Sequence, residues 1–166
     1  MFFKAKGTFP KTSFKTIMSL AFMALASLCI SACHHHEGSE DQLEEYADSF
    51  ATQYYNWHFE KALKYCTPES EMWLRYAASN VHQADIDSLR AKDEDATIEH
   101  GDIHYDDNDT TAIIDITAKN FLQMDSIGQV AHLVDEATFS IPMVLRHGKW
   151  MVKMGSLPRS EKQSHD

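Results

Sequence analysis

The segment TAIIDITAKNFLQM, residues 111–124, alternates apolar and polar side chains. Its even positions carry the apolar set: Ala112, Ile114, Ile116, Ala118, Leu122 and Met124. The polar set lies between them: Thr111, Asp115, Thr117, Lys119 and Gln123. A period of two places each set on its own face of a β-strand. The segment is therefore predicted to be a strand with one face on the core and the other in water.

Three further segments have strand character. Residues 137–145 repeat the alternation, and His147-Gly148-Lys149 then turns the chain into residues 150–154, which predicts a hairpin. Residues 97–105 form an earlier candidate strand, separated from the central one by the acidic turn at 106–109. Together these segments predict an antiparallel sheet of about four strands.

The region before the strands shows helical spacing instead. Apolar residues recur every three or four positions over residues 43–57, then again over 59–66 and 69–92, with Thr67-Pro68 ending the second stretch. Three helices followed by about four strands indicate the α+β class, with the helices packed on one side of a curved sheet.

Two passages carry a family resemblance: YYNWHFEKAL at residues 54–63 and VLRHGKWMV at residues 144–152. Over residues 41–154 the pattern resembles the nuclear transport factor 2-like superfamily, a cone-shaped, cystatin-like superfold shared with ketosteroid isomerase. The resemblance implies a cavity between the concave sheet and the helices that can hold a ligand or a reaction. Another cystatin-like or helix-on-sheet domain is the main alternative.

The N-terminus has the order of an export signal. Four lysines without an acidic residue precede the apolar run 17–30, which is shorter than the roughly 20 residues of a membrane span. Ile30-Ser31-Ala32-Cys33 resembles a bacterial lipobox, and together with the domain pattern the chain looks like small lipoproteins of that superfamily. The resemblance implies that residues 1–32 are cleaved and that Cys33 carries acyl chains such as palmitate. An ordinary signal peptide followed by a chance cysteine is the alternative.

The remaining chain has the length of one domain. We expect residues 33–41 to form the lipidated cysteine and a tether, 42–154 a single α+β domain, and 155–166 a polar, disordered tail. After cleavage 11 basic and 25 acidic residues remain, a formal charge of −14, which argues against nucleic-acid binding. Cys66 is then the one unmodified cysteine, so it has no partner for an internal disulfide and is expected to be an unreactive core thiol.

Aromatic side chains offer the first candidate site. A ligand pocket would be walled by Tyr54, Trp57, His58, Trp73 and Tyr76. The competing interpretation is that these rings form the ordinary core between helices and sheet.

A second candidate lies on the first strand. His100, Asp102 and His104 occupy alternate positions, so on a regular strand they would share a face, and His100 with Asp102 is the best acid-base pair. A solvated polar face is the competing interpretation. No metal site or cofactor is predicted, because His34, His35 and His36 lie on a tether without fixed geometry.

Three functional hypotheses follow. The favoured one is a non-enzymatic module, lipid-anchored in the cell envelope, that binds a small molecule or another envelope protein; the sequence does not say which membrane or leaflet. The second is a small isomerase or dehydratase that works in the cone cavity. The third is a scaffold that forms a homodimer through its sheet face.

Overall fold

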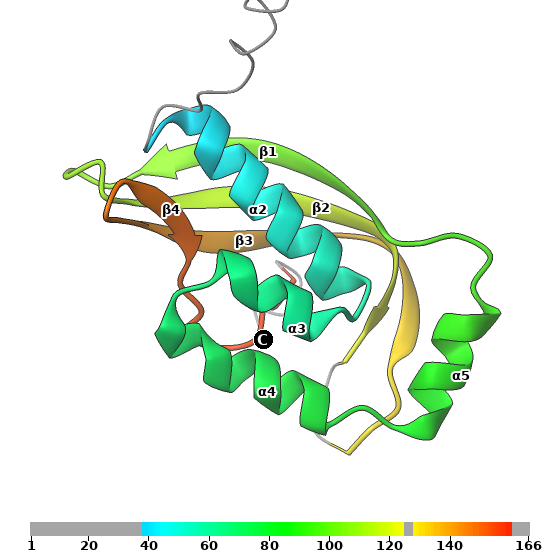
Figure 1. Ribbon diagram of the computed structural model, residues 1–166. Helices are drawn as coiled ribbons and strands as arrows, with labels where there is room; N and C mark the ends of the chain where they lie inside the picture. Colours follow the sequence, from blue (N-terminus) through cyan, green and yellow to red (C-terminus); the bar gives the residue numbers. More distant parts are fainter. Residues whose placement is uncertain (1–37, 125–127, 161–166) are drawn as a thin grey trace, which may run out of the picture. The chain divides into compact units, whose positions relative to one another are not determined.

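The computed structural model describes residues 38–124 and 128–160. The expected signal peptide, Cys33 and the histidines of the tether lie outside these ranges. The helices are α2 (Glu40–Tyr55), α3 (Phe59–Ala62), α4 (Glu71–Ser79) and α5 (Gln83–Ala91); the strands are β1 (Thr97–Tyr105), β2 (Thr111–Gln123), β3 (His132–Arg146) and β4 (Lys149–Val152) (Figure 1). Within the described ranges, no helix combines the length and apolar character needed to cross a membrane.

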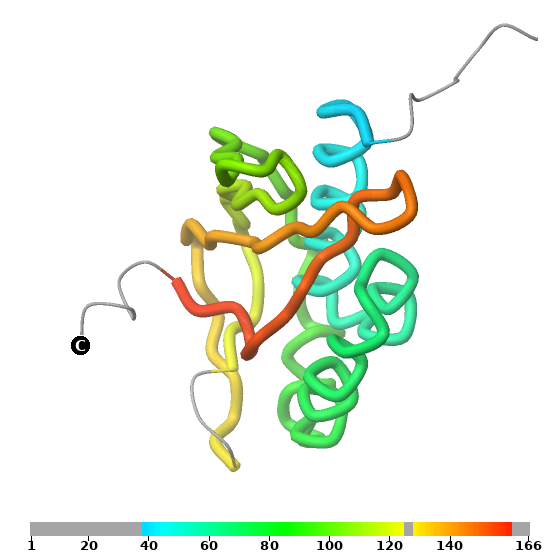
Figure 2. The backbone as a smooth tube through the Cα atoms, turned by 90° about the vertical axis from the view of Figure 1, so that its left-hand side faces the viewer, coloured from blue at the N-terminus to red at the C-terminus, as the bar shows by residue number. Residues whose placement is uncertain are grey.

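The four strands form one antiparallel sheet in the order β1-β2-β3-β4. The helices lie on one side of it (Figure 2). The even positions of β2 from Ala112 to Ala118 face the helices and are buried, as the alternation predicts. The predicted class, α+β with helices packed on a curved antiparallel sheet, is confirmed.

The longest helix, α2, begins where its sequence supplies a cap. The Ser39 hydroxyl accepts the backbone N–H of Gln42 at 3.2 Å, and Glu40 and Asp41 in the first turn interact favourably with the helix dipole. One stripe of the helix is buried against the sheet: Leu43, Ala47, Phe50, Ala51 and Tyr55. Burial of this stripe positions the C-terminal end of α2 over the sheet.

The region 69–92, predicted as one helix, is two helices. The Asn80 side chain donates to the carbonyl of Tyr76 at 2.8 Å and ends α4, because a side-chain amide competes with the backbone ladder. His82 then starts α5 in extended conformation, and Asp85 accepts its backbone N–H at 2.7 Å.

The sheet changes phase within β2. Asn120 has φ of +52°, and directly after it both Phe121 and Leu122 are buried, which a simple alternation does not allow. Asn is one of the few residues that adopts this left-handed conformation readily. Phe121 thereby joins the helix-facing side of the sheet.

The C-terminal segment does not begin a free tail at residue 155. Met154 is in the core, and Ser160 forms an isolated antiparallel bridge with Phe139 of β3. The physical reason is that β4 pairs only with residues 143–146 of β3, which leaves the neighbouring edge of β3 open for the returning chain. The predicted domain boundary is thus too early, and residues 161–166 lie outside the described part.

The described residues, 38–124 and 128–160, all belong to one compact unit, whose bounds are residues 35 and 166. All described core residues lie within it, from Leu43 to Met154. This unit therefore contains the hydrophobic core that it needs to fold by itself.

Candidate functional site: an aromatic pocket

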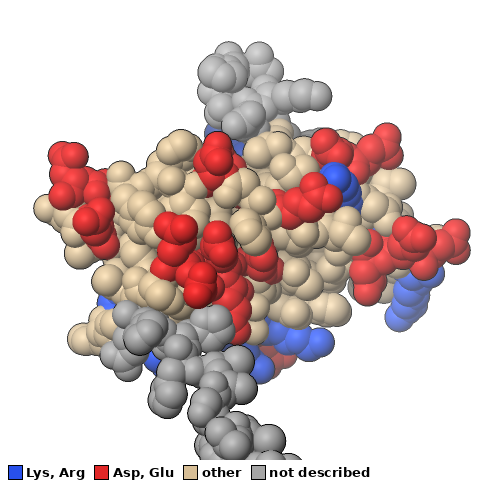
Figure 3. Space-filling view, turned by 90° about the horizontal axis from the view of Figure 1, so that it is seen from above, with Lys and Arg blue, Asp and Glu red and all other residues tan. Residues whose placement is uncertain are grey.

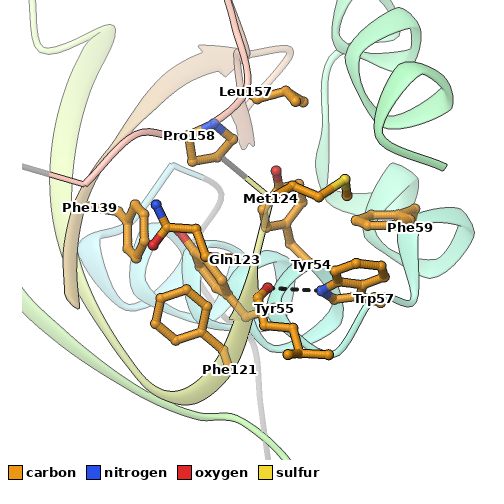
Figure 4. Close-up of a pocket in the computed structure, with 11 residues that line it drawn as sticks. Tyr54, Tyr55, Trp57, Phe59, Phe121, Gln123, Met124, Phe139, Leu157 and Pro158 are labelled. Carbon is orange, nitrogen blue, oxygen red and sulfur yellow. Dashed lines mark hydrogen bonds between the residues drawn. The ribbon is translucent and has the colours of Figure 1, made fainter. Parts of the chain in front are cut away.

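A pocket lies where α2 ends, α3 begins and β2 reaches its far end (Figure 4). Its volume is about 30 Å³, enough for roughly one water molecule. The residues that line it are Tyr54, Tyr55, Trp57, Phe59, Phe121, Leu122, Gln123, Met124, Phe139, Leu157 and Pro158. The site is therefore mainly aromatic and, as it stands, nearly filled by its own side chains.

The rings that wall the pocket form a connected cluster. Tyr55 packs on Phe121 and Phe139 with ring centroids 5.1 and 4.8 Å apart. On the other side, Phe59 lies 5.6 Å from Tyr54. Figure 4 shows Phe121 and Phe139 on one wall and Phe59 on the opposite one. Such edge and tilted contacts hold the walls firmly.

Trp57 connects the helical layer to the sheet at the rim of this pocket. Its backbone has φ of +60°, a conformation that costs a bulky residue roughly 1–3 kcal/mol. The indole Nε1–H donates to the carbonyl of Leu122 at 3.0 Å (Figure 4). The left-handed backbone ends α2, and the indole bond offsets part of its cost by joining segments 65 residues apart.

Tyr55 contributes a polar atom with no partner. Its side chain is 3% exposed, and its hydroxyl is one of the buried atoms without a hydrogen bond among the described residues. Burial, and secondarily the neighbouring Tyr54, raises the pKa of Tyr55, and burial raises the pKa of Tyr54 as well. Both tyrosines are therefore neutral phenols at physiological pH, able to donate or accept a hydrogen bond but not to carry charge.

The five aromatic or imidazole residues predicted as a pocket are only partly brought together. Tyr54 and Trp57 line it. His58 is exposed at the start of α3, and Trp73 and Tyr76 on α4 are half-buried away from the lining. The sequence pattern did not predict that residues of β2 and β3 line the pocket. Phe121 breaks the alternation of β2, and this break was the one sign in the sequence that it faces the helices.

The prediction that His100 and His104 lie on the same face of the first strand is wrong. The β1–β2 register shifts between His100 and Ile103, so that His100 lies opposite the buried Ile116 while His104 lies opposite the exposed Ile113. This bulge puts the two histidines on different faces of the sheet.

His100 instead contacts α2. Its Nδ1 lies 2.9 Å from Asp48, and its Nε2 lies 3.7 Å from Glu44. The hydrogen bond with Asp48 is the main cause that raises the pKa of His100, and the charges of Asp48 and Glu44 add to it against partial burial. The side chains of His100 and Asp48 are 40% and 39% exposed. Figure 3 shows one face of the molecule, on which many acidic side chains gather.

Cys66 behaves as the sequence predicts. It is buried and free, its thiol donates to the carbonyl of Ala62, and burial raises its pKa to about 12. A thiol that is not ionised at neutral pH is a poor nucleophile. Within the described ranges, no group of His, Cys, Asp and Glu side chains is arranged to hold a metal ion.

Comparison with known proteins adds little to this geometry. No protein-family model matches the chain, and no curated protein is significantly similar to it. One similar solved structure is described as an "Ntf2 like protein involved in plasmid conjugation"; it shares 13% identity over 70% of this chain and 46% of that chain, with a TM-score of 0.33. The chain thus matches less than half of that protein's length, and a likeness of this strength assigns neither family nor function.

Proposed function

We propose that this protein is a cell-envelope lipoprotein of the nuclear transport factor 2-like superfamily, whose domain is a non-enzymatic binding module for a small molecule or an envelope protein. The aromatic pocket with its unpartnered Tyr55 hydroxyl carries the binding half of the proposal. The Ile30-Ser31-Ala32-Cys33 sequence carries the anchoring half.

The composition of the pocket favours binding over reaction. An isomerase or dehydratase needs a group that accepts and returns a proton near neutral pH. The described residues that line the pocket include no Asp, Glu or His, and their two tyrosines have raised pKa values. The His100 cluster, which could exchange protons, belongs to the α2–β1 contact and not to the pocket lining.

Binding is tested by titrating the unit 35–166 with N-phenyl-1-naphthylamine, a neutral aromatic amine. We expect the indole N–H NMR signal of Trp57 to shift, because this residue lines the pocket. The indole signals of Trp73 and Trp150 are internal controls, since neither residue lines it. An unmoved Trp57 signal at saturating probe would contradict a small-molecule site here.

Anchoring is tested by replacing Cys33 with Ser in the full chain and following its processing in cells. We expect an unlipidated, uncleaved precursor, because acylation of the cysteine precedes cleavage in this pathway. The Cys29→Ser variant is the matched control and should be processed and fractionate with membranes. Normal processing of the Cys33→Ser chain would rule out the lipoprotein assignment.

A further inference from the structure

The segment that follows β4 covers the aromatic pocket. Leu157 and Pro158 are both half-buried and line the pocket together with Tyr55. Figure 4 shows these two residues on one side of the pocket, with the ring walls on either side of it. This segment therefore forms one side of the pocket.

The hydrogen bonds that fasten this segment lie near its two ends. Before it, the N–H of Lys153 donates to Pro142 and the N–H of Met154 donates to the Ser70 hydroxyl, both at 2.9 Å. After it, Ser160 bridges Phe139. Gly155 and Ser156 between them are exposed, and the space around Gly155 is open.

The middle of the segment is therefore held mainly by the apolar contacts of Leu157 and Pro158. Burying an apolar side chain fully is worth about 1.5–3 kcal/mol, and half-burial is worth correspondingly less. Lifting these two residues should then cost much less than global unfolding.

The pocket lining beneath Leu157 and Pro158 is aromatic and uncharged. The walls are aromatic, the lining includes no charged side chain among the described residues, and the buried Tyr55 hydroxyl lacks a partner. Aromatic walls favour flat rings, a phenol can pair with one polar group, and an uncharged lining disfavours ions. The acidic surface of the domain further disfavours anions.

We propose that residues 156–159 are a displaceable plug, and that the site beneath takes a flat, uncharged, mainly apolar ring compound with one hydrogen-bonding group for the Tyr55 hydroxyl. This inference rests on the proposed binding function and adds the ligand class and the gate. With the plug seated, a volume of about 30 Å³ excludes such a ligand, so binding and plug displacement are coupled.

The test compares the affinity of the unit 35–166 for N-phenyl-1-naphthylamine, measured by probe fluorescence, with and without the plug side chains. The Leu157→Ser/Pro158→Ser variant should bind at least tenfold more tightly than the unaltered domain, because no plug has to be displaced. The matched control is Arg159→Ser, an exposed position in the same segment, which should bind as the unaltered domain does. Adding Tyr55→Phe to the double variant should weaken binding about threefold to tenfold through loss of one hydrogen bond.

The outcomes separate the plug from the proposed function. Equal, tight binding by the unaltered domain and the double variant would overturn the plug and leave the binding function standing. No binding by any form would overturn both. Binding by the double variant that ignores Tyr55→Phe would overturn the assigned ligand contact.

A second measurement needs no variant of the plug. In hydrogen exchange on the unaltered domain, saturating probe should speed exchange of the Leu157 and Arg159 amides, because the ligand displaces these plug residues, whereas Ser160 stays bridged to Phe139. Slower exchange at these amides on binding would overturn the proposal.

Discussion

Asp85 is a charged residue with no exposed surface, 0%. Its carboxylate accepts the backbone N–H groups of His82 at 2.7 Å and Ala131 at 2.8 Å. Burial alone would raise the pKa of this carboxyl, but the two N–H groups and the His82 imidazole outweigh it, and the pKa of Asp85 is lowered. Asp85 therefore fastens the start of α5 to the chain that enters β3.

Replacing Asp85 with Asn should lower the free energy of unfolding by about 1–3 kcal/mol at pH 7, because one buried donor loses its charged acceptor. The folded pKa of Asp85 lies below the ordinary value of 3.8, so its contribution is complete above about pH 4 and is lost as the pH falls through the folded pKa. Urea unfolding at pH 7, 5 and 3 should show the difference shrinking in acid. The control Asp87→Asn, at an exposed position of the same helix, should change stability by less than about 0.5 kcal/mol; equal losses in both variants would contradict this role.

The contribution of His100 to stability depends on pH in the opposite direction to that of Asp85. Its pKa is raised above 6.5 by Asp48 and Glu44, so its stabilising contribution is present below pH 6.5 and is lost as the pH rises through the folded pKa. Because the pair is exposed, His100→Gln should cost less than about 1 kcal/mol at pH 5.5 and nothing at pH 9. The matched comparison is His104→Gln, which lies on the other face of the sheet. An NMR titration that places the pKa of His100 at or below 6.5 would contradict the contact.

At the scale of elements, the bend in β2 depends on Asn120. Its left-handed backbone turns Phe121 toward the helices, and its side chain donates to the carbonyl of Glu94 at 3.0 Å. The Lys92 ammonium donates in turn to the Asn120 carbonyl. The strand bend and the loop before β1 therefore support each other.

Two substitutions at position 120 separate the contribution of the left-handed backbone to stability from that of the side-chain hydrogen bond. Asn120→Gly and Asn120→Val both lose the side-chain hydrogen bond, but only valine also strains a left-handed backbone, at a cost of about 1–2 kcal/mol. The valine variant should be less stable than the glycine variant by that amount in urea unfolding. Equal stability of the two would mean that residue 120 is not left-handed in solution.

At the scale of the whole molecule, the dominant property is charge. Residues 33–166 carry a formal charge of −14, and self-repulsion of this size destabilises the compact state. Ion pairs on the surface of the described residues, such as Lys119 with Glu99 at 2.7 Å, each offset little of this repulsion.

Salt should therefore stabilise the domain. Raising NaCl from 20 to 500 mM at pH 7 shortens the screening length well below the size of the molecule and should raise the melting temperature of the unit 35–166. At pH 4.5, where many carboxylates are protonated, the same change should have a smaller effect. A melting temperature that falls or stays constant with salt at pH 7 would contradict net self-repulsion.

The sequence by itself determined the features that repeat along the chain. Alternation over residues 111–118 predicted the central strand and its buried face, helical spacing after Leu43 predicted α2, and their order predicted the α+β class. These predictions are correct because the type of secondary structure, and the face of each element that is buried, follow from local periodicity. The lipobox is a local pattern as well, and its prediction awaits the Cys33 experiment.

Only the tertiary structure decided which distant residues meet. The bulge between His100 and Ile103 turns His100 toward α2. The left-handed backbone at Asn120 places Phe121 in the pocket lining. The chain that returns to the open edge of β3 places Leu157 and Pro158 in the same lining. These contacts join segments tens of residues apart, so they depend on strand register and sheet curvature. No local period of the sequence encodes either quantity, because a shift of one residue in pairing changes every facing side chain.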